Sequence, residues 1–349
     1  MRIIQSMEVR DEAQVGAVRR AVHVYAGEIG FTERELAEID IVVQEVGTNA
    51  ARYAKGGGQI HFTTMLGAEP GLELFYTDQG PGIYDLERVV RDGVSTGGSL
   101  GAGLGAVRRL TDEFEVYSTI QGTGRLASLA RRTTHGTALL ARKWVAGARL
   151  ADKTHAATAG RRIGVWSRPH PKEEVNGDAY FVNRRAGQTL IAVVDGLGHG
   201  AGAHEASQVA LEILAGWQGE SLADVFHAAH AALRPTRGAV MGACVLDTTR
   251  GAFSYAGVGN IEVRVFNAPE TVRPISNNGT LGARLDKVRV WSSTWAEGAS
   301  VVLASDGVSA TWDINDYPGL LQKSPQLLAG ILMRDYGRDS DDATVLVAR

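Results

Sequence analysis

Aspartates at the ends of apolar segments most strongly constrain how the second half of this chain can fold. Four apolar segments of strand length begin or end on an aspartate that stands beside a glycine or a second aspartate. These acids are Asp178, Asp195, Asp306 and the neighbours Asp341 and Asp342. One acid in this setting is commonly a turn residue or a helix cap, but clustered carboxylates repel and raise one another's pKa. Because a divalent cation removes that cost, the four positions together predict a metal centre.

Oxygen ligands narrow the choice of metal. No Cys/His pattern accompanies the acids, so Mg²⁺ or Mn²⁺ is favoured over Zn²⁺. Asp195 opens the stretch "DGLGHGAG", in which Gly196 can offer its backbone carbonyl to a metal and the small residues leave room for a phosphoprotein. Two such ions can activate a water molecule and clamp a phosphate. We interpret His199 as part of this glycine loop and not as a metal ligand.

A long amphipathic helix is predicted in the first half, over residues 32–54. Thr32 and Glu35 have the spacing of a capping box at its start. An apolar stripe then recurs every three or four residues, as in a core-facing helix, at Leu36, Ile39, Val43, Val46, Ala50 and Tyr53. Glu45 and Asn49 flank this stripe and are four residues apart, so they lie one above the other.

Two glycine-rich stretches follow this helix. A predicted strand ends at Asp78, which is followed by Gly80 and Gly82. The second stretch contains Gly101, Gly103 and Gly105. It leads directly into a helix start, where free backbone N–H groups can bind phosphates. These glycines do not sit in a first strand–turn–helix unit, so a dinucleotide fold is not indicated, and no GxxxxGK[ST] loop is present.

Three motifs of the first half resemble those of a known superfamily. In chain order, "EVGTNAARYA", "DQGPGI" and "GGSLGAGLGAVRRL" resemble the N, G1 and G2 boxes of the GHKL (Bergerat-fold) ATPases and kinases. Within that superfamily the likeness is to the bacterial switch-protein serine kinases and anti-sigma factors of the RsbT type, and it covers residues 1–145. It implies a Bergerat-fold α/β sandwich that binds ATP and Mg²⁺.

The resemblance implies a role for each matching residue. Asn49 would coordinate Mg²⁺ between the phosphates, and Glu45 would be the general base toward a protein hydroxyl. Asp78 would hydrogen-bond the adenine amino group, while Gly80 and Gly82 let the base approach. The residues that line the phosphates would be Gly101, Gly103 and Gly105. A carboxylate one turn from a metal-binding amide suits phosphoryl transfer, which needs a cation at the phosphates and an acceptor hydroxyl held in line.

A histidine kinase is the main rival within that superfamily. It would need a helical hairpin with a phosphoacceptor histidine upstream, and only 31 residues precede Thr32. His23 lies among them on a helix of the domain itself, so we interpret it as structural. The spacing from Gly82 to Gly97 is too short for a long ATP lid, which favours a pocket open to a protein substrate.

The second half has its own ordered motifs, "NGDAYFV", "VVDGLGHGAGAHEAS", "YAGVGN", "LASDGVS" and "DDATVLV". They resemble the bacterial PP2C-like serine phosphatases of the SpoIIE/RsbX type over residues 163–349. The resemblance implies an α-β-β-α sandwich with two Mn²⁺ or Mg²⁺ ions held by Asp178, Asp195, Gly196, Asp306 and Asp341. Asp342 is the alternative to Asp341. The arginine-containing motif of the eukaryotic members has no clear counterpart in this sequence.

An Ala-, Gly- and Thr-rich stretch without a strong period separates the two halves. We therefore predict an α/β (α+β) protein of two domains, with boundaries at 1–145, a linker at 146–162, and 163–349. At 349 residues the chain is long enough to bury two such cores.

Composition argues against several other classes of protein. The net charge is −3 with Lys and Arg scattered along the chain, which gives no reason to expect nucleic acid as a partner. The single cysteine, Cys244, allows no internal disulfide and fits a reducing compartment. No apolar run approaches membrane-spanning length and charges come too early for a signal peptide, so we expect a cytoplasmic protein without a membrane partner.

Together these observations favour a bifunctional enzyme that phosphorylates and dephosphorylates a serine or threonine of a regulatory protein. By resemblance, that partner is a STAS-domain protein, an anti-sigma antagonist or a stressosome scaffold, in a sigma-factor or stress-signalling partner switch; other switch proteins stay open as partners. In the alternative interpretation only the second half is catalytic. The first half is then an ATP-binding module that sequesters a partner without phosphorylating it.

Overall fold

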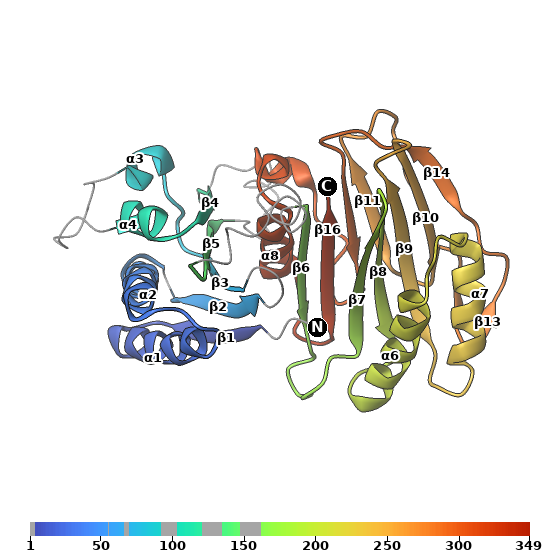
Figure 1. The fold of residues 1–349 in the computed structure, drawn as a ribbon, viewed down its shortest axis with the longest axis horizontal. Coiled ribbons are helices and arrows are strands. Elements are labelled where there is room, and N and C mark those ends of the chain that lie inside the picture. The colour runs from blue at the N-terminus through green and yellow to red at the C-terminus, as the bar shows by residue number, and fades with distance from the viewer. Residues whose placement is uncertain (1–3, 55, 66–69, 92–102, 121–134, 147–161) are drawn as a thin grey trace. The chain divides into compact units, whose positions relative to one another are not determined.

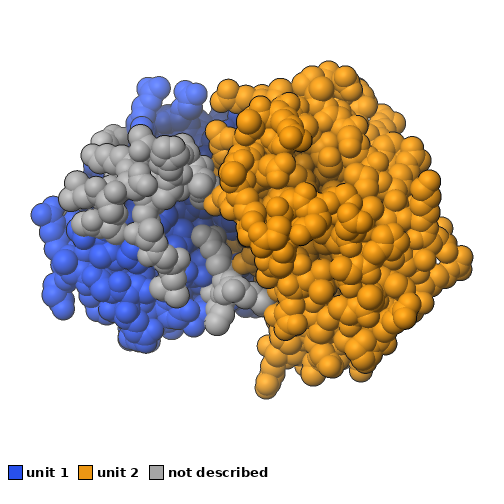
Figure 2. Space-filling view, turned by 45° about the vertical axis from the view of Figure 1, so that its right-hand side comes forward, with its two compact units in different colours: residues 1–161, 313–327 blue, residues 162–312, 328–349 orange. Residues whose placement is uncertain are grey.

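The computed structural model describes residues 4–54, 56–65, 70–91, 103–120, 135–146 and 162–349 (Figure 1). It falls into two compact units, residues 1–161 with 313–327 and residues 162–312 with 328–349 (Figure 2). Almost all of the predicted linker lies outside the described residues, as does Gly101. The predicted domain boundaries therefore stay predictions. The grouping of residues 313–327 with the first unit was not anticipated from the sequence.

The N-terminal unit is a five-stranded antiparallel sheet with helices on one face. The strand order is β1 (Gln5–Val9), β2 (Gly58–Met65), β3 (Gly71–Asp78), β5 (Gly136–Trp144) and β4 (Glu113–Thr119). The helices are α1 (Glu12–Glu28), α2 (Glu33–Tyr53), α3 (Leu86–Val90) and α4 (Gly103–Leu110). Alternate strand residues share a face, so Ile60 and Phe62 of β2 join Leu74 and Tyr76 of β3 in the core beneath the helices.

Helix α2 begins and packs as its sequence predicts. Thr32 accepts a hydrogen bond from the backbone N–H of Glu35, and the Glu35 carboxylate accepts one from the Thr32 N–H, which completes the capping box. The stripe from Leu36 to Ala50 is buried against α1 and the sheet. Tyr53 departs from this prediction, because its side chain is 49% exposed and lines a cavity instead of the core.

The C-terminal unit is a sandwich of two antiparallel sheets. The first sheet has the order β14 (Trp291–Thr294), β10 (Ala252–Val258), β9 (Ala239–Asp247), β8 (Gln188–Gly196) and β7 (Asp178–Arg185). The second has the order β11 (Glu262–Phe266), β15 (Ser300–Ala304), β16 (Ala343–Ala348) and β6 (Ile163–Arg168). The other elements are α6 (Ala201–Ala215), α7 (Leu222–Leu233), α8 (Pro325–Tyr336), and a small hairpin of β12 (Gly279–Thr280) and β13 (Arg284–Leu285). The first residues of α8 and two 3-10 turns, Ile314–Asp316 and Leu320–Gln322, lie in the segment that groups with the first unit.

Strand β8 lies at the centre of this sandwich because both of its faces are apolar. Leu190, Ala192 and Val194 pack against α6 and α7, whereas Ile191 and Val193 pack against the second sheet. The alternation follows from the two-residue period of a strand, and burial on both faces explains the continuous apolar run. With α8 on the far side of the second sheet (Figure 1), the layers are α-β-β-α. The predicted fold class is confirmed.

No helix in the described ranges is both long and apolar enough to cross a membrane.

Candidate nucleotide pocket and acidic centre

A cavity of about 280 Å³ opens in the N-terminal unit between α2, the end of β3, α4 and β5. Its polar lining includes Glu45, Asn49, Arg52, Asp78 and Thr137. Its apolar lining includes Val46, Ile83, Val89, Leu104 and Leu139. A mostly apolar cleft with a few convergent polar groups is typical of a small-molecule site.

Asp78 is the most firmly held polar group in this cavity. It is the last residue of β3 and only 9% exposed. One carboxylate oxygen accepts hydrogen bonds from the backbone N–H groups of Gly80 at 2.7 Å and Thr137 at 3.2 Å, and the other accepts one from the Tyr76 hydroxyl at 2.7 Å. These donors hold the carboxylate in one orientation, as a site that recognises a base by hydrogen bonding requires.

Glu45 and Asn49 lie one turn apart on α2, half-buried, and both line the same cavity as Asp78. Arg52 continues the same face and forms an ion pair with Glu12 at 3.6 Å. A single rigid helix therefore presents a carboxylate, an amide and a guanidinium to one space, while the neighbouring sheet presents Asp78.

The predicted glycines divide into three groups. Gly82 and Gly103 line the cavity, and both have positive φ, 79° and 41°. Gly80 and Gly105 are not among the lining residues. Gly80 instead supports Asp78, because a β-carbon there would lie 2.9 Å from the carboxylate. Gly101 lies outside the described residues. Thr137 and Leu139 escaped sequence reasoning, since β5 carries no motif and reaches the site only by pairing with β3.

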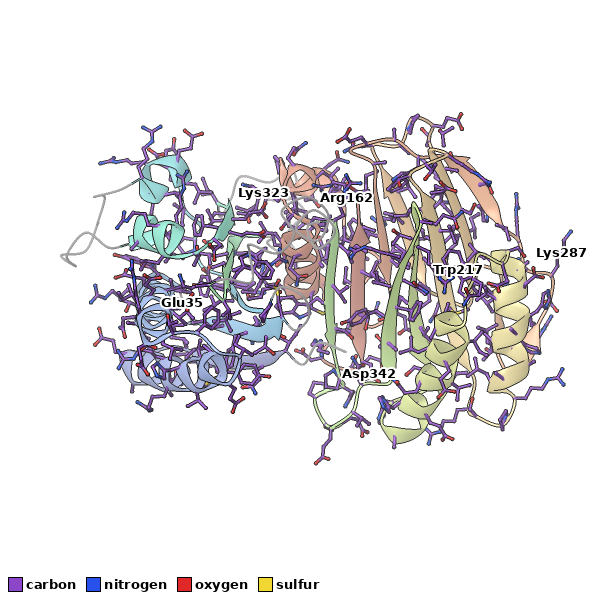
Figure 3. The ribbon with its side chains drawn as sticks, in the orientation of Figure 1. Glu35, Arg162, Trp217, Lys287, Lys323 and Asp342 are labelled. Atoms are coloured by element: carbon purple, nitrogen blue, oxygen red, sulfur yellow. The ribbon has the colours of Figure 1, made fainter. Side chains whose placement is uncertain are left out.

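The acidic centre of the C-terminal unit begins with a cross-strand pair. Asp178, the first residue of β7, stands directly opposite Asp195 near the end of β8. Asp306 follows β15, and Asp341 and Asp342 precede β16, at the corresponding end of the second sheet. Figure 3 labels Asp342 at this end of the sheets. The predicted aspartates are thus brought to one end of the sandwich.

Burial and mutual repulsion oppose ionisation of these acids. Burial is the largest cause that raises the pKa of Asp178, although hydrogen bonds from Ser305 and Thr344 oppose the shift. Burial also raises the pKa of Asp195, and the charges of Asp178 and Asp306 add to that effect. The pKa of Asp306 is raised by burial as well.

Polar neighbours hold the acids in place. The Ser305 hydroxyl donates to Asp178 at 2.6 Å and thereby links the two sheets. The Asn260 amide donates to Asp306 at 2.7 Å. Asp341 accepts a hydrogen bond from the backbone N–H of Asp342 at 3.0 Å. Ser305 and Asn260 lie within the motifs "LASDGVS" and "YAGVGN", but a role for them became visible only from the contacts.

Asp342 has the carboxylate that best fits a cation site. The residue is 3% exposed, and one of its oxygens accepts the backbone N–H of His170 at 2.8 Å. Its other oxygen is buried without any hydrogen-bond partner. Burying a carboxylate oxygen without a hydrogen-bond donor costs folding free energy, and a bound cation would offset that cost. The all-oxygen donor set fits Mg²⁺ or Mn²⁺.

In the described part of the chain, no three His, Cys, Asp or Glu side chains form a group that could hold a metal ion. The choice of Asp341 over Asp342, and the rest of the predicted ligand set, therefore stay predictions.

The glycine loop after Asp195 packs too closely for side chains. A β-carbon on Gly196 would lie 2.0 Å from the carbonyl oxygen of Ala203. Gly198 and Gly200 have positive φ, 84° and 74°. The His199 ring stacks on His170 at 4.7 Å and its Nδ1 lies 2.6 Å from the Glu173 carboxylate. His199 thus contacts loop neighbours, and its assignment as a loop residue stays a prediction.

Comparisons with known proteins agree with this architecture. Residues 9–128 match the model of the histidine kinase-like ATPase domain, and residues 185–349 match that of stage II sporulation protein E (SpoIIE). The chain is therefore a fusion of a kinase-like ATPase domain with a PP2C-like phosphatase domain.

Two relatives and one solved structure are each similar to part of this chain. "Serine/threonine-protein kinase RsbT" of Bacillus subtilis (strain 168) is 39% identical over 119 residues, which are 34% of this chain and 88% of RsbT. "Phosphoserine phosphatase RsbX" of the same organism is 23% identical over 179 residues, 51% of this chain and 88% of RsbX. A chain from a solved structure of the bacterial stressosome has a TM-score of 0.51 at 30% identity, covering 54% of this chain and 98% of that one. The first half of the chain belongs to the family of the serine/threonine-protein kinase RsbT, and the second half matches the SpoIIE model.

The raised pKa values of Asp178, Asp195 and Asp306 predict how the metal-free protein responds to pH. The folded state holds these protons more tightly than the unfolded chain, in which an aspartate has a pKa of about 3.9. The free energy of unfolding should therefore be greatest near pH 4 and fall as the pH rises toward the folded-state pKa values. Thermal unfolding in EDTA, followed by tryptophan fluorescence, measures this free energy. The signal reports on the C-terminal unit because every tryptophan except Trp144 lies within residues 162–312.

Asp195→Asn should raise the melting temperature of the metal-free protein at neutral pH and flatten its pH dependence. Burial raises the pKa of Asp195 to about 9, and an amide stays neutral in the same place without taking up a proton. Asp286→Asn, at an exposed position, is the matched control. A metal-free melting temperature that rises with pH above about 5 would contradict this account.

Proposed function

We propose that this chain is a bifunctional protein-serine/threonine kinase and phosphatase acting on a STAS-domain regulatory protein in a partner switch. Support comes from two separate sites on one chain, the nucleotide-sized cavity and the acidic centre. It comes also from the names of two relatives, a serine/threonine-protein kinase and a phosphoserine phosphatase. The structure of a bacterial stressosome, in which a similar chain occurs, supports a stress-signalling context.

The single observation that carries the kinase assignment is the shared cavity of Glu45, Asn49 and Asp78. Asp78 holds the adenine amino group of ATP, and Asn49 would hold a Mg²⁺ ion, which would offset the charge of the phosphates. Glu45 accepts the proton of the acceptor hydroxyl while the hydroxyl oxygen forms a bond to the γ-phosphorus. The bond between the γ-phosphorus and the ADP oxygen breaks, and ADP leaves with its electrons. Mere nucleotide binding needs no carboxylate one turn from the amide, so Glu45 favours an enzyme over a sequestering module.

The phosphatase assignment rests on the converging aspartates. Asp178, Asp195, Asp306, Asp341 and the carbonyl of Gly196 would hold two Mn²⁺ or Mg²⁺ ions. When bound, such ions supply an activated water and a clamp for the phosphate. The protein's own part is to hold the carboxylates at the ends of rigid strands, where Ser305 and Asn260 orient two of them.

Replacing Glu45 tests the kinase against the sequestering module. Glu45→Gln should leave ATP affinity nearly unchanged and slow phosphate transfer to a STAS-domain protein at least about a hundredfold, because only the general base is lost. Asn49→Ala should weaken Mg·ATP binding as well. Radiolabel transfer and nucleotide titration measure the two effects. Glu33→Gln, an exposed acid on the same helix, is the control. Undiminished transfer by Glu45→Gln would refute its role, and no transfer by the unaltered chain would favour sequestration.

Metal removal tests the phosphatase. Hydrolysis of p-nitrophenyl phosphate or a phosphoserine protein should stop in EDTA and return with Mn²⁺ or Mg²⁺. Asp195→Asn and Asp306→Asn should each abolish it while the melting transition persists, whereas Asp286→Asn should not. Turnover that resists EDTA would exclude a metal centre.

A complementation experiment tests whether both sites act on one residue of the partner. The Asp195→Asn chain should accumulate phosphorylated partner, and the Glu45→Gln chain should remove that phosphate, because each retains the activity the other lacks. Mass spectrometry of the partner follows the phosphorylated position. Failure of the Glu45→Gln chain to dephosphorylate that product, while it hydrolyses p-nitrophenyl phosphate, would show that the two sites serve different residues.

A further inference from the structure

One arginine borders the acidic centre from the side of β9. Strands β8 and β9 are antiparallel, so the end of β8 lies beside the start of β9, and Gly196 pairs with Ala239. One residue further, the backbone N–H of Leu197 donates to the carbonyl of Gly238 at 3.0 Å. Arg237 directly precedes Gly238, so the topology places it at the sheet edge where Asp195 and Gly196 leave the strand.

The Arg237 side chain lies along the glycine loop. A β-carbon added to Gly202 would lie 2.5 Å from its Nε and 2.7 Å from its Cζ, and one added to Gly198 would lie 3.5 Å from its Nη1. The guanidinium therefore spans the space that these two glycines leave open. Any larger residue at Gly202 would force the side chain to move.

The charge of Arg237 is not neutralised by a neighbour. Arg237 is exposed, and within the described ranges it has no ion pair or hydrogen bond from its side chain. The nearby acid Glu173 contacts His199 instead, on the Gly200 side of the loop. A free guanidinium thus lies next to a centre built from carboxylates.

Charge balance gives this guanidinium a role. The five aspartates of the centre, two divalent cations and Arg338, whose charge acts to lower the pKa of Asp306, sum to about zero, so a phosphate monoester with a charge of about −2 meets a centre with no net attraction. A planar guanidinium offers paired N–H donors that match phosphate oxygens. The arginine-containing motif of the eukaryotic members has no clear counterpart in this sequence, and Arg237 supplies a cation from a different element.

We propose that Arg237 binds the phosphoryl group of the phosphoprotein at the acidic centre. This inference rests on the proposed phosphatase function and assigns that site a substrate-binding residue.

Kinetics with p-nitrophenyl phosphate and inorganic phosphate test the assignment. In the full-length chain with Mn²⁺, Arg237→Ala should raise both the KM and the inhibition constant for phosphate about tenfold or more, because a charge-assisted hydrogen bond is lost. The Mn²⁺ concentration for half-activation should not change. Arg237→Lys should restore part of the loss. Arg234→Ala removes the same charge from an exposed position three residues away and should behave as the unaltered chain.

Gly202→Ala provides a second test that keeps the charge. Its methyl group should displace the guanidinium and weaken phosphate binding in the unaltered chain. In the Arg237→Ala background the same change should have little further effect, because the two substitutions act on one interaction. Additive effects would mean that Gly202 acts through the start of α6 itself and would overturn the assigned position of Arg237.

A measurement of phosphate binding distinguishes failure of the proposed phosphatase function from failure of the Arg237 assignment. Equilibrium dialysis with labelled inorganic phosphate and the Mn²⁺-loaded chain needs no turnover. If the unaltered chain hydrolyses nothing, the phosphatase function fails, while weaker phosphate binding by Arg237→Ala still supports the site. If the unaltered chain is active and Arg237→Ala matches it in KM and phosphate binding, the inference is wrong and the phosphatase function stands.

Discussion

Repulsion between buried carboxylates is the constraint on which the C-terminal unit depends. Asp178 and Asp195 face each other across two paired strands, and Ser305 joins Asp178 to the second sheet. Apolar packing on both faces of β8 keeps these acids close in spite of their charges. The fold therefore carries a local instability at one end that a divalent cation would relieve, and the same arrangement that costs stability without metal would create affinity for it.

The N-terminal unit holds its buried acid differently, with hydrogen-bond donors around the carboxylate. Asp78 is buried, yet three hydrogen-bond donors from β3, the following turn and β5 satisfy its oxygens. Its carboxylate thus needs no metal and can recognise a base. The two halves thus treat aspartates at strand ends differently. Backbone and hydroxyl donors satisfy Asp78, whereas one carboxylate oxygen of Asp342 is buried without a hydrogen-bond partner.

Close packing of glycines serves both sites. Gly80 leaves room for the Asp78 carboxylate, and Gly196 approaches the carbonyl of Ala203 as only a residue without a β-carbon can. Gly198 and Gly202 leave the space that Arg237 occupies. Glycines near these sites thus shape the surroundings of charged groups as well as permitting turns, which explains why the same motif can hold an acid and admit a guanidinium.

The sequence by itself determined the features that depend on local spacing. The capping box of Thr32 and Glu35, the buried stripe of α2 and the apolar faces of β8 follow from periods of 3.6 and 2 and from short-range hydrogen bonds. Only the tertiary structure decided that Thr137 donates to Asp78, that Ser305 holds Asp178 and that Arg237 spans the glycine loop. The partners in these contacts lie 35 to 127 residues apart and meet through strand pairing and sheet packing, which no local pattern encodes.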